Sequence, residues 1–191
     1  MKSLSKTENM RSKVFTVPNI LSMIRIALIP LIVWLYHFNN DSAAAAVVVI
    51  ASGVTDVVDG FIARKFNMVS DLGKALDPVA DKLTQTATLM CLLVQFPLMW
   101  LPLSLLVVKE FISGIWRLIV FHRTREVRGA KWHGKVSTVL LYGIMLLHIL
   151  WPSIPGAYSS LSIVLCTLMM ILSFFLYSKE NFRALKDSPC T

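Results

Sequence analysis

Four aspartates in two short stretches carry the clearest chemical pattern in this chain of 191 residues. Asp56 and Asp59 are three residues apart, and Asp77 and Asp81 are four residues apart. Both spacings place the paired side chains on one face of an α-helix. The flanking segments, AAAAVVVIASGVT before Asp56 and LTQTATLMCLLV after Asp81, are apolar enough to lie in a membrane. Carboxylates at the ends of two such helices are expected to have a binding or catalytic role, because unpaired charge in lipid is energetically unfavourable.

Divalent cations would remove the repulsion among these carboxylates. A short connection makes the two helices antiparallel neighbours, so the four acids should converge on one small volume near one membrane surface. Carboxylate oxygens suit hard ions such as Mg²⁺ or Mn²⁺, and two ions would balance four negative charges and clamp a diphosphate. Small residues on the same faces, Gly60, Ala63 and Gly73, leave room for a bulky ligand. Asp77 has an alternative interpretation, because Asp followed by Pro78 is also typical of a helix N-cap.

The composition indicates an integral membrane protein. Hydrophobic residues make up 55% of the chain and charged residues 16%, against about 45–50% and about 25% in soluble domains. Three cysteines show no spacing typical of a disulfide framework or a zinc site. The net charge of +8 does not indicate a nucleic-acid partner, because the basic residues follow the pattern of membrane loops.

We predict an all-α integral membrane protein with six transmembrane helices and an N-terminal amphipathic juxtamembrane helix. The spans are expected at roughly 21–38, 43–64, 75–95, 98–121, 136–152 and 157–177. The loops HFNNDS, QFPLMW and WPSIPG contain no Lys or Arg, which predicts a multi-pass protein of the cell membrane with both termini and the site in the cytoplasm. The expected organisation is a polar tail at 1–12, one membrane domain at 13–178 and a cytoplasmic tail at 179–191.

The first apolar segment has a second interpretation. Basic residues, an apolar run and then NNDSAAAA are also typical of a signal peptide and its cleavage site. Losing that segment would place one terminus outside and break the alternation of charged loops, so we interpret it as the first span. Arg25 within it is compatible with a snorkelling side chain at the lipid surface and with a role in the site.

Residues 56–81 read D-x2-D-G-x2-A-R-x8-G-x3-D-x3-D, and in this pattern the chain resembles the CDP-alcohol phosphatidyltransferases. Members of that family use divalent metal to transfer a phosphatidyl group from CDP-diacylglycerol to an alcohol, releasing CMP. The resemblance implies that Asp56, Asp59 and Asp77 hold one ion and that Asp56, Asp77 and Asp81 hold a second, with Asp81 as general base. It implies contacts to CDP-diacylglycerol from Asn19, Gly60, Ala63, Arg64, Ser70 and Gly73, and a possible homodimer. Arg64 alone would also fit a positive-inside residue at a helix end.

A second group of charges bears on the acceptor alcohol. Lys109 and Glu110 lie near the middle of the fourth predicted span, and Arg117 follows seven residues after Glu110. Such residues either face a wet cavity or pair with each other during assembly. Lys131 and Lys135 border the next helix. A cationic pocket formed by Lys109, Arg117, Lys131 and Lys135 would suit an acceptor that is itself a phosphate ester, of which glycerol 3-phosphate is the simplest candidate.

The order KE…R…GK is similar to the phosphatidylglycerophosphate synthase branch of the family, in which the stretch reads R-E, then R, then G-K-x-K-T. Lys109 and Ser137 depart from it, so the CMP-forming cardiolipin synthases, whose acceptor is phosphatidylglycerol, remain an alternative, as do other branches. A transporter using the aspartates as a cation relay is the alternative from another class of protein. The chain has no internal repeat, and release of CMP would distinguish the two classes.

Overall fold

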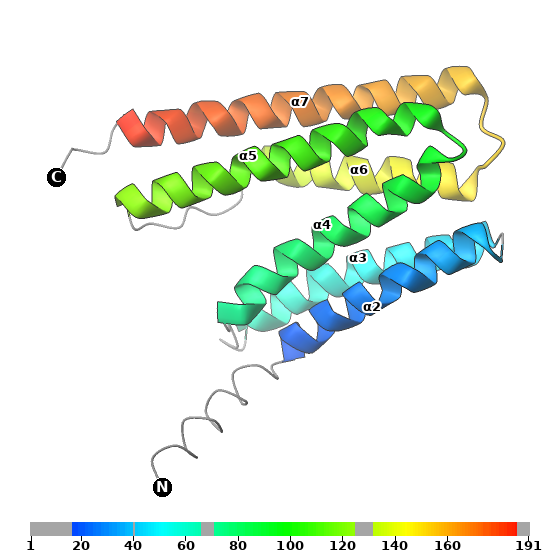
Figure 1. The fold of residues 1–191 in the computed structure, drawn as a ribbon, viewed down its shortest axis with the longest axis horizontal. Helices are drawn as coiled ribbons and strands as arrows, with labels where there is room; N and C mark the ends of the chain where they lie inside the picture. Colours follow the sequence, from blue (N-terminus) through cyan, green and yellow to red (C-terminus); the bar gives the residue numbers. More distant parts are fainter. Residues whose placement is uncertain (1–16, 40, 66–70, 125–131, 187–191) are drawn as a thin grey trace, which may run out of the picture. The chain divides into compact units, whose positions relative to one another are not determined.

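The computed structural model describes residues 17–39, 41–65, 71–124 and 132–186, with side chains described for 19–39, 41–58, 77–115 and 134–179. The described ranges form six α-helices and one short 3-10 helix and contain no strand, which confirms the all-α prediction. In chain order they are α2 (Val17–His37), α3 (Ser42–Lys65), α4 (Asp71–Leu93), η1 (Pro97–Met99), α5 (Trp100–Thr124), α6 (Trp132–Leu150) and α7 (Gly156–Lys186) (Figure 1).

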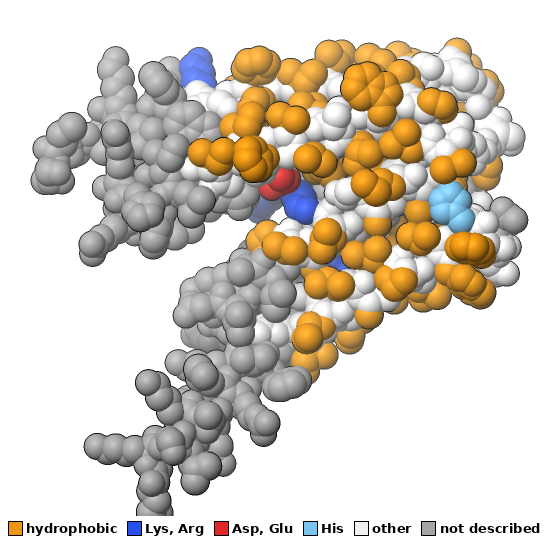
Figure 2. Space-filling view, viewed as in Figure 1, with side chains coloured by type: hydrophobic (Ala, Val, Ile, Leu, Met, Phe, Trp, Pro, Cys, Tyr) orange, Lys and Arg blue, Asp and Glu red, His pale blue; other side chains and the backbone are white. Residues whose placement is uncertain are grey.

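Apolar runs of the sequence account for most of the helices and indicate association with a membrane. Of the described residues, three helical segments are long and apolar enough to cross a bilayer: Asn19–His37, Pro97–Ile115 and Gly156–Lys179. Two apolar helical segments are shorter, Ser42–Val58 and Gly134–Leu150. Large hydrophobic side chains such as Trp34, Phe111 and Phe175 point outward, and Figure 2 shows hydrophobic side chains over much of the described surface. The count of six spans and their orientation stay predictions.

The helix bounds correct one expectation and leave others untested. Asp77 is not an N-cap, because α4 already begins at Asp71 and contains Pro78 within it. Pro30 likewise lies inside α2, as membrane helices tolerate. The tail at 1–12 and most of the predicted juxtamembrane helix lie outside the described residues.

The chain divides into two compact units, Met1–Cys91 and Leu92–Thr191, and the single domain expected at 13–178 stays a prediction. In the first unit α2 packs along α3 (Figure 1). The α3 face in this contact carries small buried residues, Ala45, Ala46, Val49 and Ser52, which let the two backbones approach closely. Asp41 starts α3 by accepting a hydrogen bond at Oδ1 from the backbone N–H of Ala44 at 2.9 Å.

In the second unit α7 packs along both α5 and α6. A buried polar pair joins the end of α6 to the first turn of α7. His148 Nδ1 lies 2.8 Å from the carbonyl oxygen of Ile144 and must donate to it, because a carbonyl only accepts. Nε2 therefore accepts from the Ser159 hydroxyl at 2.9 Å. His148 is fully buried, so this bond satisfies a polar atom that would otherwise lie in an apolar core.

Candidate active site

Helix α2 carries a polar stripe on one face of an otherwise apolar sequence. Asn19, Ser22 and Arg25 are spaced three residues apart, so their side chains follow one side of the helix. All three are buried, with exposed fractions of 1%, 0% and 0%. Burying polar groups and a charge is unfavourable unless they find partners. For Ser22 and Arg25, the partners include two of the predicted aspartates.

Arg25 forms an ion pair with Asp56 of α3. Its Nη1 lies 2.6 Å from Asp56 Oδ1, the short distance of a charge-assisted hydrogen bond. The Arg25 side chain is 0% exposed and the Asp56 side chain 40% exposed. Arg25 is therefore not a snorkelling residue, and that interpretation of the sequence is wrong.

Asp77 is hydrogen-bonded to Ser22, the middle residue of this polar stripe on α2. The Ser22 hydroxyl donates a hydrogen bond to Asp77 Oδ1, which links α2 to α4 across 55 residues of sequence. Asp77 lies one helical turn before Asp81 on α4. The spacing predicted from the sequence thus places both carboxylates on one face of a continuous helix.

Asp81 is held from within its own helix. Gln85 Nε2 lies 3.0 Å from each carboxylate oxygen of Asp81. Lys82 Nζ lies 3.3 Å from Asp81 Oδ2 and 3.1 Å from Gln85 Oε1. The Asp81 side chain is 14% exposed. It is thus a mostly buried carboxylate whose orientation is set by an amide and an ammonium group.

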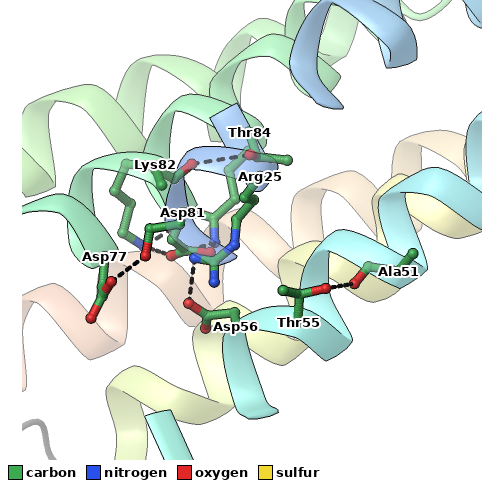
Figure 3. Close-up of polar contacts among 11 residues, drawn as sticks. Arg25, Ala51, Thr55, Asp56, Asp77, Asp81, Lys82 and Thr84 are labelled. Atoms are coloured by element: carbon green, nitrogen blue, oxygen red, sulfur yellow. Dashed lines mark hydrogen bonds and ion pairs between the residues drawn. The ribbon is translucent and has the colours of Figure 1, made fainter. Parts of the chain in front are cut away.

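Figure 3 shows these groups together, with Arg25 reaching from α2 to Asp56 on α3 while Asp77 and Asp81 project from α4. Asp77 and Asp81 act electrostatically on Asp56, and both repel its negative charge. A buried guanidinium among three carboxylates reduces that repulsion. Three of the four predicted metal ligands thus lie within electrostatic range of one another, and the side chain of the fourth, Asp59, lies outside the described side chains.

The donor set suits a hard divalent cation by its chemistry. Its carboxylate oxygens are the ligands that Mg²⁺ and Mn²⁺ prefer, and the buried cation of Arg25 already lies against this anionic region. Among the side chains that the structure describes, no group of three His, Cys, Asp or Glu is arranged closely enough to hold a metal ion. The case for a divalent cation at this site therefore depends on the type of donor atom, carboxylate oxygen, and on the negative charge of the aspartates.

The remaining predicted residues are distributed over both units. Asn19 is buried on α2. Ser70 and Lys131 lie outside the described residues. Other predicted contacts lie in described helices, but their side chains are outside the described part: Gly60, Ala63, Arg64, Gly73 and Arg117. In the second unit, Lys109 is half-buried on α5 and Lys135 is exposed near the start of α6. The roles proposed for all these residues stay predictions.

Three residues of the site, Ser22, Lys82 and Gln85, were missed in the sequence. For Ser22 and Gln85 the helical spacing gives a signal. Ser22 lies between Asn19 and Arg25 on one face of α2, and Gln85 lies one turn after Asp81. The partner of Ser22 lies on another helix and cannot be identified without knowing which faces pack together, whereas the contact of Gln85 with Asp81 lies within α4 and follows from the spacing.

Most of the chain is similar to one family of enzymes. The family model described as CDP-alcohol phosphatidyltransferase matches residues 15–179. A Bacillus subtilis (strain 168) protein named CDP-diacylglycerol--glycerol-3-phosphate 3-phosphatidyltransferase is 34% identical over 194 residues, covering 91% of this chain and 99% of that protein. A Rickettsia bellii protein of the same name is 39% identical over 101 residues, covering 51% of this chain and 56% of that protein. A Streptomyces coelicolor protein named cardiolipin synthase (CMP-forming) is 40% identical over 109 residues, covering 54% and 51%.

Proposed function

This chain belongs to the CDP-alcohol phosphatidyltransferase family, and from that premise we propose that it transfers a phosphatidyl group from CDP-diacylglycerol to glycerol 3-phosphate. The products are phosphatidylglycerol phosphate and CMP. The observation that supports this acceptor most strongly is the similarity to the Bacillus subtilis protein, which extends over nearly the whole of both chains. Membership of a transferase family rejects the transporter hypothesis.

The cardiolipin synthase branch is the second candidate. The Streptomyces coelicolor protein is slightly more similar where it matches, but that match spans about half of each chain. The two candidates share their donor, their leaving group and the aspartates, and they differ only in the acceptor. Phosphatidylglycerol would replace glycerol 3-phosphate as the molecule whose hydroxyl attacks.

Members of this family generally use divalent metal. In this chain Asp56, Asp59, Asp77 and Asp81 are the residues that would hold it, as two ions of Mg²⁺ or Mn²⁺. When bound, the metal would neutralise the diphosphate of the donor and the charge that develops on the leaving CMP. Ser22 and Arg25 hold Asp77 and Asp56 in place for this role.

The proposed reaction is an in-line displacement at phosphorus. The hydroxyl oxygen of the acceptor attacks the phosphorus attached to diacylglycerol, and the bond from that phosphorus to the oxygen of CMP breaks. Asp81 accepts the hydroxyl proton at a carboxylate oxygen, which requires that the acceptor bind within hydrogen-bond reach. Much of the rate should come from positioning, as in other phosphoryl transfers. The hydrogen bonds from Gln85 and the ion pair with Lys82 already restrict the orientation of this base.

The substrate contacts follow from the resemblance. Asn19, Gly60, Ala63, Arg64, Ser70 and Gly73 are proposed to contact CDP-diacylglycerol. Lys109, Arg117, Lys131 and Lys135 are proposed to bind the phosphate of the acceptor. The cytoplasmic orientation of the site and a homodimer stay predictions of the same kind.

The proposal is tested by measuring CMP release from CDP-diacylglycerol with purified protein and Mg²⁺ or Mn²⁺. The acceptor panel contains glycerol 3-phosphate, phosphatidylglycerol, inositol phosphate and serine, and Asp81→Asn is the control variant. We expect CMP only with glycerol 3-phosphate, and none from the variant. Release with phosphatidylglycerol alone would move the enzyme to the cardiolipin branch. No release with any acceptor from folded, metal-loaded protein would refute phosphatidyl transfer.

A further inference from the structure

Gln85 is a fully buried primary amide of α4, and the two other buried polar residues close to it, Thr84 and Thr88, bond to their own helix. Its exposed fraction is 0%. The neighbouring Thr84 and Thr88 donate to the backbone carbonyls one turn before them, at 3.0 and 2.8 Å. An amide has more hydrogen-bonding groups than a hydroxyl, so its burial is unfavourable unless those groups are satisfied. At Gln85 the described partners are Asp81 and Lys82.

The orientation of this amide follows from the chemistry of its two neighbours. Lys82 Nζ, 3.1 Å from Oε1, is an ammonium group and only donates. The oxygen of the Gln85 amide must therefore face Lys82. The amide nitrogen then faces Asp81, whose ionised carboxylate only accepts, at 3.0 Å from each oxygen. The reverse orientation would set an acceptor against a carboxylate and a donor against an ammonium group.

The contact with Asp81 is symmetric, and this symmetry has a mechanical consequence. An amide nitrogen equally distant from both carboxylate oxygens resists rotation of the carboxylate about its bond to Cβ. The amide is itself fixed by burial and by Lys82. Asp81 therefore keeps one orientation before any ligand binds. Fixing a ligand in advance in this way is what a supporting residue does and a residue that only fills space does not.

We propose that Gln85 is a positioning residue for Asp81, with Lys82 setting the orientation of its amide. The inference rests on the proposed function, because it concerns the carboxylate assigned there as metal ligand and general base. A structural role for Gln85, in which it only packs α4, is the competing explanation. The two differ in what changes when the amide is removed: positioning affects metal binding and kcat, whereas packing affects unfolding.

The test compares Gln85→Met with Thr88→Val in the full-length protein. Methionine matches glutamine in length but cannot donate or accept as the amide does. Thr88→Val removes a buried polar group from the same helix without touching Asp81, and serves as the matched control. Mn²⁺ binding is measured by electron paramagnetic resonance, CMP release gives kcat and the KM for CDP-diacylglycerol, and tryptophan fluorescence follows thermal unfolding.

We expect Gln85→Met to lower Mn²⁺ affinity and kcat by roughly 10–100-fold each, the usual effect of losing a group that supports a metal ligand. KM for CDP-diacylglycerol should change little, and the unfolding temperature should shift no more than in Thr88→Val. In the Asp81→Asn background, where only Mn²⁺ affinity can be compared, the same substitution should lower that affinity no further, because Gln85 acts through Asp81.

Three results would overturn the proposal: unchanged Mn²⁺ affinity and kcat in Gln85→Met, equal losses in Thr88→Val, or the full loss of Mn²⁺ affinity again in the Asp81→Asn background. A failure of the proposed function would give a different experimental result. Wild-type protein would then release no CMP, while the comparison of Mn²⁺ affinities would still decide whether Gln85 positions Asp81.

Discussion

Arg25→Met removes the guanidinium that lies 2.6 Å from Asp56 and keeps an unbranched apolar side chain about as long as the aliphatic part of arginine. The perturbation deletes the one positive charge that α2 contributes to the carboxylates of the described site. Asp56, Asp77 and Asp81 would then repel one another with less compensation. Arg25→Lys is the matched control, because it keeps the charge and loses only the planar fork.

The burial of the two partners sets the expected magnitude. Breaking a fully buried ion pair costs about 3–5 kcal/mol, whereas an exposed pair contributes about 0–1 kcal/mol. Arg25 is 0% exposed, but Asp56 is 40% exposed and can be hydrated once its partner is gone. We therefore expect a loss of about 2 kcal/mol, between the two limits. For a chain of this size that corresponds to a fall of about 4–8 °C in the unfolding temperature.

The assay is thermal unfolding of detergent-solubilised protein by tryptophan fluorescence, first in EDTA and then in Mg²⁺. Arg25→Met should show the full loss in EDTA and a smaller loss in Mg²⁺, because a divalent cation can replace the missing positive charge. Arg25→Lys should fall between wild type and Arg25→Met. An unfolding temperature in EDTA equal to that of wild type, or equal losses in the Met and Lys variants, would refute the reasoning from buried charge.

Three further predictions use other parts of the molecule. Ser159→Ala removes the donor to buried His148 and should cost about 1–3 kcal/mol in thermal unfolding while leaving kcat for CMP release unchanged; an equal loss of kcat would contradict a purely structural pair. Ala45→Leu overfills the α2–α3 contact, where Ala45 is 0% exposed, and should cost about 1–3 kcal/mol; no change in unfolding would argue against that contact. Chelation with EDTA should abolish CMP release and Mg²⁺ or Mn²⁺ should restore it, whereas activity persisting in EDTA would contradict the metal site.

The helices were largely predictable because all except α4 follow from an apolar run. Hydropathy cannot decide the local start of a helix where two signals compete. The Asp77–Pro78 pair is typical of a helix start, yet α4 begins at Asp71, and continuation of the helix past a proline depends on context outside those two residues. The number of helices that cross the membrane is similarly open, since only three described segments meet the length and apolarity that a span requires.

The grouping of the aspartates was predictable from helical periodicity, but the residues of α2 that hold them were not. Spacing gives the relation between Asp77 and Asp81, which share a helix. It does not give the rotation of α2 against α3 and α4, and that rotation decides whether Arg25 points to the lipid surface or to Asp56. Ser22 and Gln85 are uncharged, and their burial beside carboxylates identifies their role.

Identifying both products formed from glycerol 3-phosphate that carries heavy oxygen in its acceptor hydroxyl tests the central claim most directly. Attack of that hydroxyl on the phosphorus attached to diacylglycerol predicts phosphatidylglycerol phosphate that retains the label and an equal amount of unlabelled CMP. Both should be lost in Asp81→Asn. Phosphatidic acid together with a cytidylyl ester, or CMP formed without labelled lipid, would contradict the proposed transfer.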